Sequence, residues 1–389
     1  MLLSTPGKLL GALALGTACG AAHAQSSVVL YGSFDAGISY ANHARTANGQ
    51  SGRLLKFDDG VDGGNRIGLR GAEDLGGGLK AIFTLESGFG GGDGTLSQGG
   101  ALFGRKAFVG LEKDGVGKFT MGRQYVFSHD YLDAYSTGGL TAAHSYAYHI
   151  NTLDQLTSSR VNNAVKFETE RFNGFKAGAM YAFSNQAGRF GGSAGDPDNN
   201  DDGSSRAYSF GADYRHGPFG IGFAFTDIAF PLNTQPAFKL TLANVDPGGE
   251  RNLRTFGLGT RYDFGSVLAY ALWTHTQLKA LDDSVSTLNI YEGGAVYSFA
   301  HAWKAGLGYT RTDLSGSKTG AWNQINSSVD YRLSKTTNVY FIAVYQKASG
   351  SNDGVPVQAQ IGKSSSYFGP SGDGAQSQMA FRVAMKHTF

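Results

Sequence analysis

Regularly spaced basic side chains are the residues of this chain best suited to act on small charged molecules. Arg66, Arg70 and Arg105 alternate with apolar residues and share their positions with small or polar ones, as Lys80 does. Alternate side chains of an extended strand lie on opposite faces, so these cations point away from the apolar face. An arginine turned to lipid is costly, so the pattern indicates a wall that faces water.

Histidines and aspartates between residues 128 and 159 are the next candidates, for a metal site or for hydrolysis. They are His144, His149, Asp130 and Asp154, with the consecutive triplet Ser128-His129-Asp130. The spacing fits no closed metal site. Three neighbours in sequence also do not face each other as a nucleophile, its base and an orienting acid must. We therefore expect no metal, no cofactor and no enzyme activity.

Two glycine- or aspartate-rich motifs do not change this expectation. The segment 196–203 hints at a calcium loop, but Asp201 stands where such a loop needs glycine and Ala207 where it needs glutamate. The segment 88–94 is rich in glycine, but no Lys-Ser/Thr pair follows it, so a phosphate-binding loop is not expected. Binding of divalent cations or lipopolysaccharide by surface loops remains open.

The composition of the 389 residues favours membrane strands over membrane helices. Apolar residues make up 41%, charged residues only 16%, and 58 residues are glycine. Mean hydropathy is -0.22. Beyond the N-terminus the chain has no apolar run of about 18 residues or more, the length that a spanning helix needs. The formal net charge of +2 is too balanced to indicate a nucleic-acid partner.

Residues 1–24 have the features of a secretory signal peptide. Lys8 precedes an apolar stretch, and Ala22-His23-Ala24 forms an A-x-A cleavage site. The only cysteine, Cys19, lies in this segment, so a lipoprotein acylated at Cys19 is the alternative. Cleavage after Ala24 leaves the chain 25–389 without a thiol, so its stability must come from buried area and hydrogen bonds.

Alternating apolar and polar residues predict sixteen strands. The segment Ala375–Phe389 alternates clearly, places Met379 and Phe381 on one face and Arg382 on the other, and ends on an aromatic residue. The other strands are predicted at 28–40, within the hairpin 65–89, and at 103–112, 118–126, 161–171, 175–183, 208–214, 219–225, 255–262, 267–274, 290–299, 304–311, 325–333 and 339–345. Two of them, 267–274 and 339–345, alternate less regularly.

The connections also alternate, short Gly- and Asp-containing turns with long polar segments. Tyrosines occur near the short turns, at positions 214, 262, 297 and 331. Short turns at one end, long loops at the other and a row of aromatics at one interface are typical of membrane barrels. The expected fold is therefore an all-β, transmembrane, 16-stranded antiparallel barrel.

A closed barrel is the form in which strands can cross a membrane, because every backbone group then has an internal partner. An arginine facing lipid near the midplane costs roughly 2–4 kcal/mol, so the basic residues belong on the inside. Barrels of 16 to 18 strands leave an aqueous channel. The inward positions are often Gly, Ala, Ser or Thr, which are too small to fill it. The sequence therefore predicts a water-filled pore.

The chain resembles the general diffusion porins of Gram-negative outer membranes, in particular those of beta-proteobacteria and neisseriae. The matching stretches are Ser27–Tyr40, Asn65–Phe89, Gly104–Tyr125, the G-A-x-Y hairpins at Gly178–Tyr181 and Gly211–Tyr214, and the terminal Phe389. This resemblance implies a homotrimer of barrels in the outer membrane, each with its own pore. It also implies that the third long loop, here 128–159 and called the constriction loop below, folds inward.

The resemblance further implies that wall arginines face loop acids across the narrowest part of the pore. By position the wall residues are Arg66, Arg70, Arg105 and Arg160, the loop acids are Asp130, Asp133 and Asp154, and Asp35 adds one acid from the first strand. Opposed charges across a narrow water path order small polar solutes. The balance of these charges predicts a weak preference for anions. The alternative role of some of these arginines is to brace the wall by pairing with carboxylates.

Two further residues have expected roles in assembly. Arg123 has the parity of outward-facing Phe119 and Met121, and because arginine is unfavourable in lipid we expect it at the subunit interface. The resemblance implies that Phe389 is recognised by the outer-membrane assembly machinery. The other expected partners are outer-membrane lipid, lipopolysaccharide, and small hydrophilic solutes and ions.

Passive diffusion through a general porin is the predicted function, and a solute-specific channel is the alternative. The latter needs inward aromatics at successive depths, for which the candidates are Tyr31, Tyr131, Tyr135, Tyr146 and Tyr148. An adhesin or phage-receptor role of the loops is also compatible with the sequence.

Overall fold

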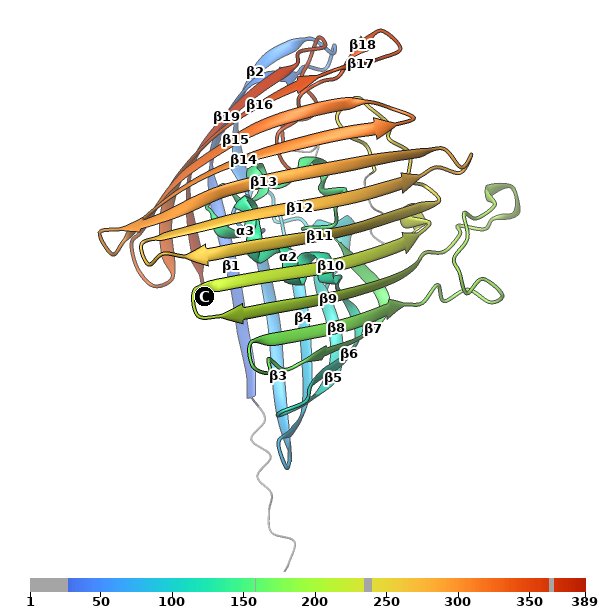
Figure 1. Cartoon of the computed structure of the whole chain (residues 1–389), viewed down its shortest axis with the longest axis vertical. Helices are drawn as coiled ribbons and strands as arrows, with labels where there is room; N and C mark the ends of the chain where they lie inside the picture. Colours follow the sequence, from blue (N-terminus) through green and yellow to red (C-terminus); the bar gives the residue numbers. More distant parts are fainter. Residues whose placement is uncertain (1–26, 158, 234–239, 364–366) are drawn as a thin grey trace, which may run out of the picture.

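A closed β-barrel forms the body of the protein (Figure 1). The computed structural model describes residues 27–157, 159–233, 240–363 and 367–389. The predicted signal peptide 1–24, with Cys19, lies outside these residues. No helix among the residues described is long and apolar enough to span a membrane.

Sixteen antiparallel strands form the ring, as predicted. In ring order they are β1 (Ser27–Arg45), β3 (Arg66–Gly76), β4 (Leu79–Gly88), β5 (Lys106–Lys113), β6 (Gly117–Tyr125), β7 (Arg160–Thr169), β8 (Phe175–Ala182), β9 (Arg206–His216), β10 (Phe219–Ala229), β11 (Asn252–Asp263), β12 (Val267–Lys279), β13 (Val285–Phe299), β14 (Trp303–Gly316), β15 (Gly320–Arg332), β16 (Thr337–Ser349) and β19 (Ser377–Thr388). The ring closes where β19 pairs with β1, for example Ile38 with Val383.

Three short strands were not predicted. β2 (Ser51–Asp59) pairs with the second half of β1, where β3 pairs with the first half. It lies in a segment that reads as polar in the sequence. β17 (Ser351–Asn352) and β18 (Val355–Pro356) form a separate hairpin beyond the ring, drawn at the top of Figure 1.

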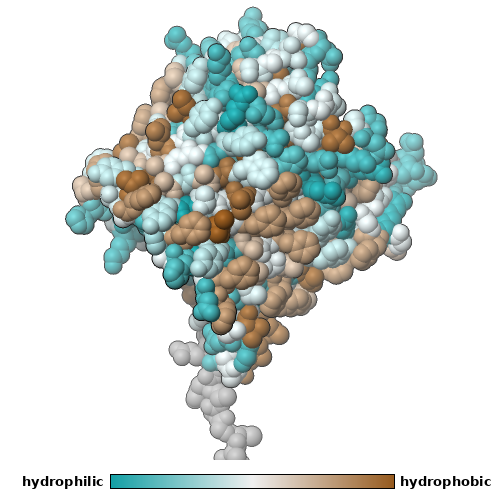
Figure 2. All heavy atoms as spheres, viewed as in Figure 1, coloured by the Kyte–Doolittle hydropathy of each residue, from teal (hydrophilic) through white to brown (hydrophobic). Residues whose placement is uncertain are grey.

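The outer face is apolar and the inner face is small or polar, as the alternation predicts. On β14, Leu307 and Tyr309 are exposed on the outside, whereas Thr310 and Thr312 are buried on the inside. Figure 2 shows brown, apolar residues running across the strands and teal, polar residues gathered at the end with the long loops. This distribution matches lipid around the strands and water at the rim.

Aromatic side chains line the barrel at the end with the short turns. Tyr262 and Tyr297 are exposed there, and the ring centroids of Trp303 and Tyr331 lie 4.5 Å apart on neighbouring strands. The predicted girdle is therefore present. Phe389 lies at the same end, where its backbone N–H and C=O both pair with Gly32, at 3.1 and 2.9 Å.

Short helices connect β6 to β7 inside the barrel. The connection contains α2 (Phe127–Leu132), η1 (Asp133–Tyr135), α3 (Thr137–Leu140), α4 (His144–Ala147) and η2 (Ile150–Thr152). The remaining helical turns lie in other loops: α1 (Ser97–Gly100), η3 (Pro197–Asn199) and η4 (Pro231–Asn233). α2 packs on β9–β11, η1 on β11 and β12, and α3 on β13 and β14, so the constriction loop folds inward as expected.

Inward glycines make room for this loop. A Cβ at Gly211 would lie 2.5 Å from the ring of Tyr131, and a Cβ at Gly222 or Gly259 would lie 2.5 Å from the side chain of Tyr135. These distances are shorter than any non-bonded contact allows. The small inner residues therefore leave space for the constriction loop as well as for water, because this loop occupies part of the bore.

The two irregular strands carry large apolar residues on their inner faces. Tyr270 and Leu272 of β12 and Ile342 and Val344 of β16 are all buried. Leu272 packs with constriction-loop residues, and Ile342 and Val344 pack with loop residues and with Ile361 of the last long loop. Alternation is weak at these strands because in-folded segments, rather than water, cover their inner faces.

Candidate pore constriction

One side of the constriction loop is fixed to the wall by a buried histidine between two carboxylates. His149 Nδ1 lies 2.5 Å from Asp154 Oδ2 and its Nε2 lies 2.6 Å from Glu292 Oε2 of β13, with all three side chains fully buried. Thr274 of β12 donates to the same Asp154 oxygen at 2.9 Å, and Glu292 also accepts from the backbone N–H of Thr137. We call these five residues the loop anchor.

The loop anchor depends on a charged imidazole. Burial alone lowers the pKa of His149, but the adjacent Asp154 and Glu292 carboxylates outweigh burial and raise this pKa to about 10. An imidazolium can donate to both carboxylates at once. Asp154, expected in the water path, is therefore held behind the loop, and the sequence did not indicate its partner Glu292.

The loop tyrosines brace the same contact with the wall. Tyr135 donates to Asp213 Oδ2 of β9 at 2.5 Å, Tyr146 donates to Asp58 of β2, and Tyr148 donates to Asp133 within the loop. These three tyrosines, like Tyr131, are buried.

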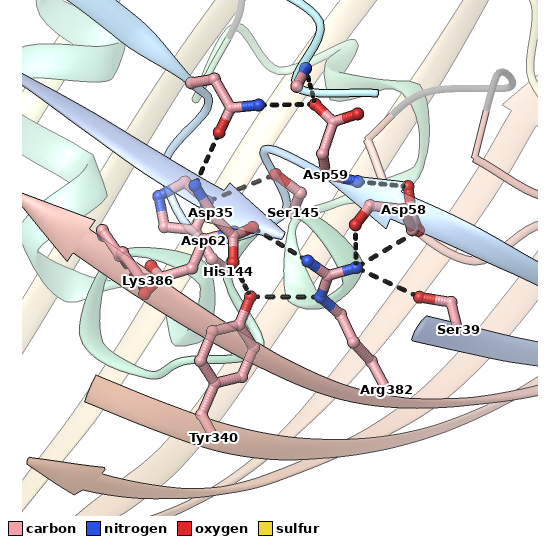
Figure 3. A network of polar contacts seen from close by, with 12 residues as sticks. Asp35, Ser39, Asp58, Asp59, Asp62, His144, Ser145, Tyr340, Arg382 and Lys386 are labelled. Carbon is pink, nitrogen blue, oxygen red and sulfur yellow. Dashed lines mark hydrogen bonds and ion pairs between the residues drawn. The ribbon is translucent and has the colours of Figure 1, made fainter. Parts of the chain in front are cut away.

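A second buried network surrounds Arg382 of β19 (Figure 3). Its guanidinium donates to Asp35 Oδ2 at 3.1 Å, to the Tyr340 hydroxyl at 3.1 Å and to the Asp58 carbonyl at 2.9 Å. Tyr340 in turn donates to Asp35 Oδ1 at 2.6 Å. Arg382 was predicted on the inner face without a role. Its pairing with Asp35 is the wall-brace role considered for this class of residue.

Arg105 and Tyr31 both bind Glu86, which was also not singled out in the sequence. Arg105 Nε lies 2.6 Å from Glu86 Oε1, and the other carboxylate oxygen accepts from Tyr31 at 2.8 Å. The Arg70 guanidinium is exposed and lies 5.4 Å from the centre of the Tyr31 ring.

The opposite side of the constriction brings several cationic side chains together. A Cβ at Gly63 would lie 3.5 Å from Lys386 Nζ, 3.6 Å from Arg66 Nη2 and 3.9 Å from His144 Nε2, so these three groups converge where glycine leaves space. Of them, Lys386 has an acidic partner, Asp62, at 3.2 Å. The only polar contact of the Arg66 side chain within the described structure is the Gly63 carbonyl, at 3.3 Å.

Arg160 belongs to the same positive side. Its guanidinium lies 4.4 Å from the centre of the Tyr125 ring and donates to the Tyr125 hydroxyl. Its Nε is buried and has no hydrogen-bond partner among the described residues.

The pKa of His144 is well below its usual value because of burial and the cations Lys363, Lys386 and Arg66, so this imidazole is neutral.

The two remaining loop acids already have partners. Asp130 forms an ion pair with Lys166 of β7. Asp133 accepts from Tyr148, and burial raises its pKa. The structure thus brings Arg66, Arg105 and Arg160 together in the neighbourhood of the loop acid Asp133. In the part of the chain that is described, no group of three or more His, Cys, Asp or Glu side chains could hold a metal ion.

Arg123 lies apart from this cluster, on β6. It is half-buried, its Nε donates to the Gly104 carbonyl at 2.8 Å and its Nη1 lies 2.5 Å from Asn162 Oδ1. These contacts orient the guanidinium within its own chain.

Comparison with known proteins shows to which protein family this barrel belongs. A model of the Gram-negative porin family matches residues 11–351. The chain belongs to this family. An outer membrane porin protein of Bordetella pertussis is 30% identical over 381 residues, covering 87% of this chain and 94% of that one. The major outer membrane protein P.IB of Neisseria meningitidis serogroup B is 25% identical over 357 residues, with the same coverage of both chains.

Solved structures agree with the fold of this porin. The anion-selective porin from Comamonas acidovorans superimposes with a TM-score of 0.73 at 25% identity, covering 94% of this chain and 100% of that one. OmpT of Vibrio cholerae gives 0.64 at 15% identity, covering 94% and 98%, which concerns the fold alone. The protein is an integral outer-membrane porin, and its barrel forms a channel.

Proposed function

We propose that this porin lets small hydrophilic solutes and ions diffuse passively and weakly favours anions. The observation that carries the proposal is the imbalance of charge at the constriction. Arg66 and Arg160 have no carboxylate partner among the described residues, whereas Asp130 and Asp154 are each paired with a basic group. Unpaired cations beside a narrow water path attract anions.

The similarity to a structure described as an anion-selective porin supports the same sign. Arg66 and Arg160 are the first residues of β3 and β7. Arginine stays charged at any physiological pH, so the expected preference does not depend on these two residues losing protons.

A single-channel recording in a tenfold potassium chloride gradient tests the proposal. We expect a reversal potential displaced towards the chloride equilibrium potential, with conductance steps in threes if the channel is a trimer. A displacement towards the potassium equilibrium potential would overturn the anion preference and leave the channel itself intact.

A solute-specific channel is the second candidate, and the burial of the loop tyrosines counts against it. A sugar slide needs aromatic faces open to water at successive depths, but Tyr131, Tyr135, Tyr146 and Tyr148 are packed against the wall. Liposome swelling with sugars of graded size separates the two candidates. We expect permeation to fall smoothly with solute size, and a sharp preference for one sugar would favour the specific channel.

We also propose that the porin is a homotrimer and that Arg123 lies at its interface. Its guanidinium stands on an otherwise apolar outer face and is oriented by Gly104 and Asn162, which suits a polar contact with a neighbouring subunit. We expect Arg123→Ala to lower the temperature at which the oligomer dissociates on semi-native gels. Trimers of unchanged heat resistance would refute the role of Arg123.

Assembly is expected to use both ends of the precursor. We propose that residues 1–24 are removed on export and that Phe389, whose ring is exposed at the end of β19, is recognised by the assembly machinery. The apolar outer face then contacts outer-membrane lipid and lipopolysaccharide. Deleting Phe389 should reduce the amount of heat-modifiable protein, while an equal amount would contradict its role.

A further inference from the structure

A second segment folds into the barrel beside the constriction loop. Residues 357–363, between β18 and β19, run along the inner wall, and we call them the inner strap. Val357, Ala359 and Ile361 are fully buried. Inward glutamines and a tryptophan of three wall strands bind its backbone: Trp322 Nε1 to the Gln358 carbonyl (2.9 Å), Gln346 Nε2 to the Gln360 carbonyl (2.9 Å), and the Ile361 N–H to Gln378 Oε1 (2.8 Å).

The inner strap is also bonded to the constriction loop. The Lys363 N–H donates to the Ser145 carbonyl at 3.1 Å, and the Asn151 N–H donates to the Gly362 carbonyl at 3.4 Å. Gln360 Nε2 donates to Asn151 Oδ1 at 2.8 Å. Backbone and side-chain bonds therefore fix the end of the strap against the loop, more than 200 residues away in sequence.

Lys363 projects from the end of this strap into the positive side of the constriction. It lines a cavity together with Arg105 and Arg160, and its Nζ lies 5.8 Å from the centre of the Tyr148 ring. It forms no ion pair within the described ranges. The inner strap, which belongs to neither the wall strands nor the constriction loop, thus places Lys363 at the constriction.

We propose that Lys363 is a selectivity-determining residue of this channel and that its charge sets the strength of the anion preference near neutral pH. The inference rests on the proposed anion preference and extends it to a residue outside the arginine wall.

The surroundings of Lys363 explain why its charge can change. Burial, followed by the charges of Arg160 and Arg105, lowers the pKa of Lys363 to about 7, although Asp133 opposes this shift. The amine is therefore protonated below about pH 7 and neutral above it. Since protonation adds a cation to the constriction, the preference for anions should be stronger at the acidic end of this range.

Charged and titratable groups surround Lys363, and two of them, His144 and Tyr148, stay neutral. The groups that face Lys363 are Arg66 from β3, Arg105 before β5, Arg160 from β7, Lys56, Asp58 and Asp59 from β2, Tyr367 beyond the strap, and Asp133, His144 and Tyr148 from the constriction loop. The arginines remain charged. The pKa of His144 is held well below its usual value and that of Tyr148 well above it, both chiefly by burial, so each stays neutral.

The experiment measures the chloride-to-potassium permeability ratio in planar bilayers at about pH 6 and about pH 8.5, on either side of the pKa of Lys363. For the native porin we expect the ratio to fall about threefold as the pH rises, the combined effect on chloride and potassium of one unit charge about 6–7 Å away in water at about 0.1 M salt. Lys363→Met should give the lower ratio at both pH values, and Lys363→Arg the higher ratio at both.

Lys318→Met is the matched control, because Lys318 is paired with Asp353 in an exposed loop; it should behave as the native porin does. Heat-modifiable trimers on semi-native gels establish that each variant is assembled. A native-like pH response in Lys363→Met or Lys363→Arg would overturn the inference. Failure of the proposed function looks different, because the native channel would then favour potassium at both pH values.

Discussion

The two sides of the constriction treat charge in opposite ways. The loop anchor buries His149 completely and places a carboxylate on each ring nitrogen, Asp154 on one and Glu292 on the other. The opposite side, which we call the open side, leaves Arg66 and Arg160 without carboxylate partners in the described structure. The acidic partners on the anchored side hold the loop, and their scarcity on the open side leaves positive potential for the water path. In the proposed function, the number of carboxylate partners, rather than the residue type, therefore distinguishes a charge that holds the structure from one that acts on passing ions.

Removing one partner from the loop anchor should have the largest effect. Glu292→Leu removes the acceptor of His149 Nε2 and of the Thr137 N–H, and breaking a buried ion pair of this kind costs about 3–5 kcal/mol. We expect the constriction loop to loosen, with noisier single-channel currents and closure at lower voltage.

Glu112→Leu is the matched control for this experiment, because Glu112 is half-exposed and lies 4.0 Å from Lys80. Its channels should behave as native ones do. Native-like currents in Glu292→Leu would show that the anchor does not hold the loop.

The next largest effect should follow from alkaline pH. The pKa of His149 is raised from 6.5 to about 10 in the folded protein, so its stabilising contribution is fully present below about pH 6.5 and is lost as the pH rises through about 10. We expect native channels to become noisy in that upper range, and His149→Gln channels to show noise that does not change with pH. Equal pH responses of the two proteins would exclude His149 as the group responsible.

Substitutions on the open side should change selectivity and spare stability. Arg160→Met or Arg66→Met removes an unpaired cation, and we expect each to lower the chloride-to-potassium permeability ratio about two- to threefold. Arg251→Met, at an exposed position paired with Asp283, serves as the control. The comparison between the two sides would fail if the open-side variants unfolded at lower temperature yet kept the native ratio.

The smallest effect is expected for Arg70. Its side chain is exposed beside Tyr31, where water and ions screen it over about 10 Å at moderate salt. Arg70→Met should change the permeability ratio by less than about 1.5-fold, and only at low ionic strength. A change as large as that of Arg160→Met would show that the narrowest part of the path extends down to Arg70.

The barrel could be predicted closely because its rule is local. Each strand faces lipid on one side, so alternation repeats every two residues, and sixteen segments with Tyr262, Tyr297 and Tyr331 near the short turns followed from it. The rule weakened at β12 and β16, where in-folded segments cover Leu272 and Ile342. Alternation did not predict β2, because the pairing of β2 with β1 depends on the tertiary fold rather than on the sequence of β2 itself.

The candidate site could be predicted only in part. Arg66 and Arg105 were found because inward parity and resemblance both marked them, and Arg160 was found through the resemblance alone, but their partners Glu86 and Tyr125 were not. Glu292 and Arg382 carry no signal of their own, since an inward charge on a strand looks the same whether a loop covers it or water does. For the inner strap a signal existed, the alternation of Val357, Ala359 and Ile361 with Gln358 and Gln360.

The order of greasy and polar residues along the chain settled by itself that this protein is a wide barrel with basic groups inside, because lipid imposes that order on every strand separately. The sequence alone does not show which of those groups are paired with carboxylates and which are left unpaired near the water path. That depends on how the constriction loop and the inner strap pack against the barrel wall. Those contacts join residues hundreds of positions apart, and the strength of a charge depends on how much water and which counter-charges the completed fold leaves beside it.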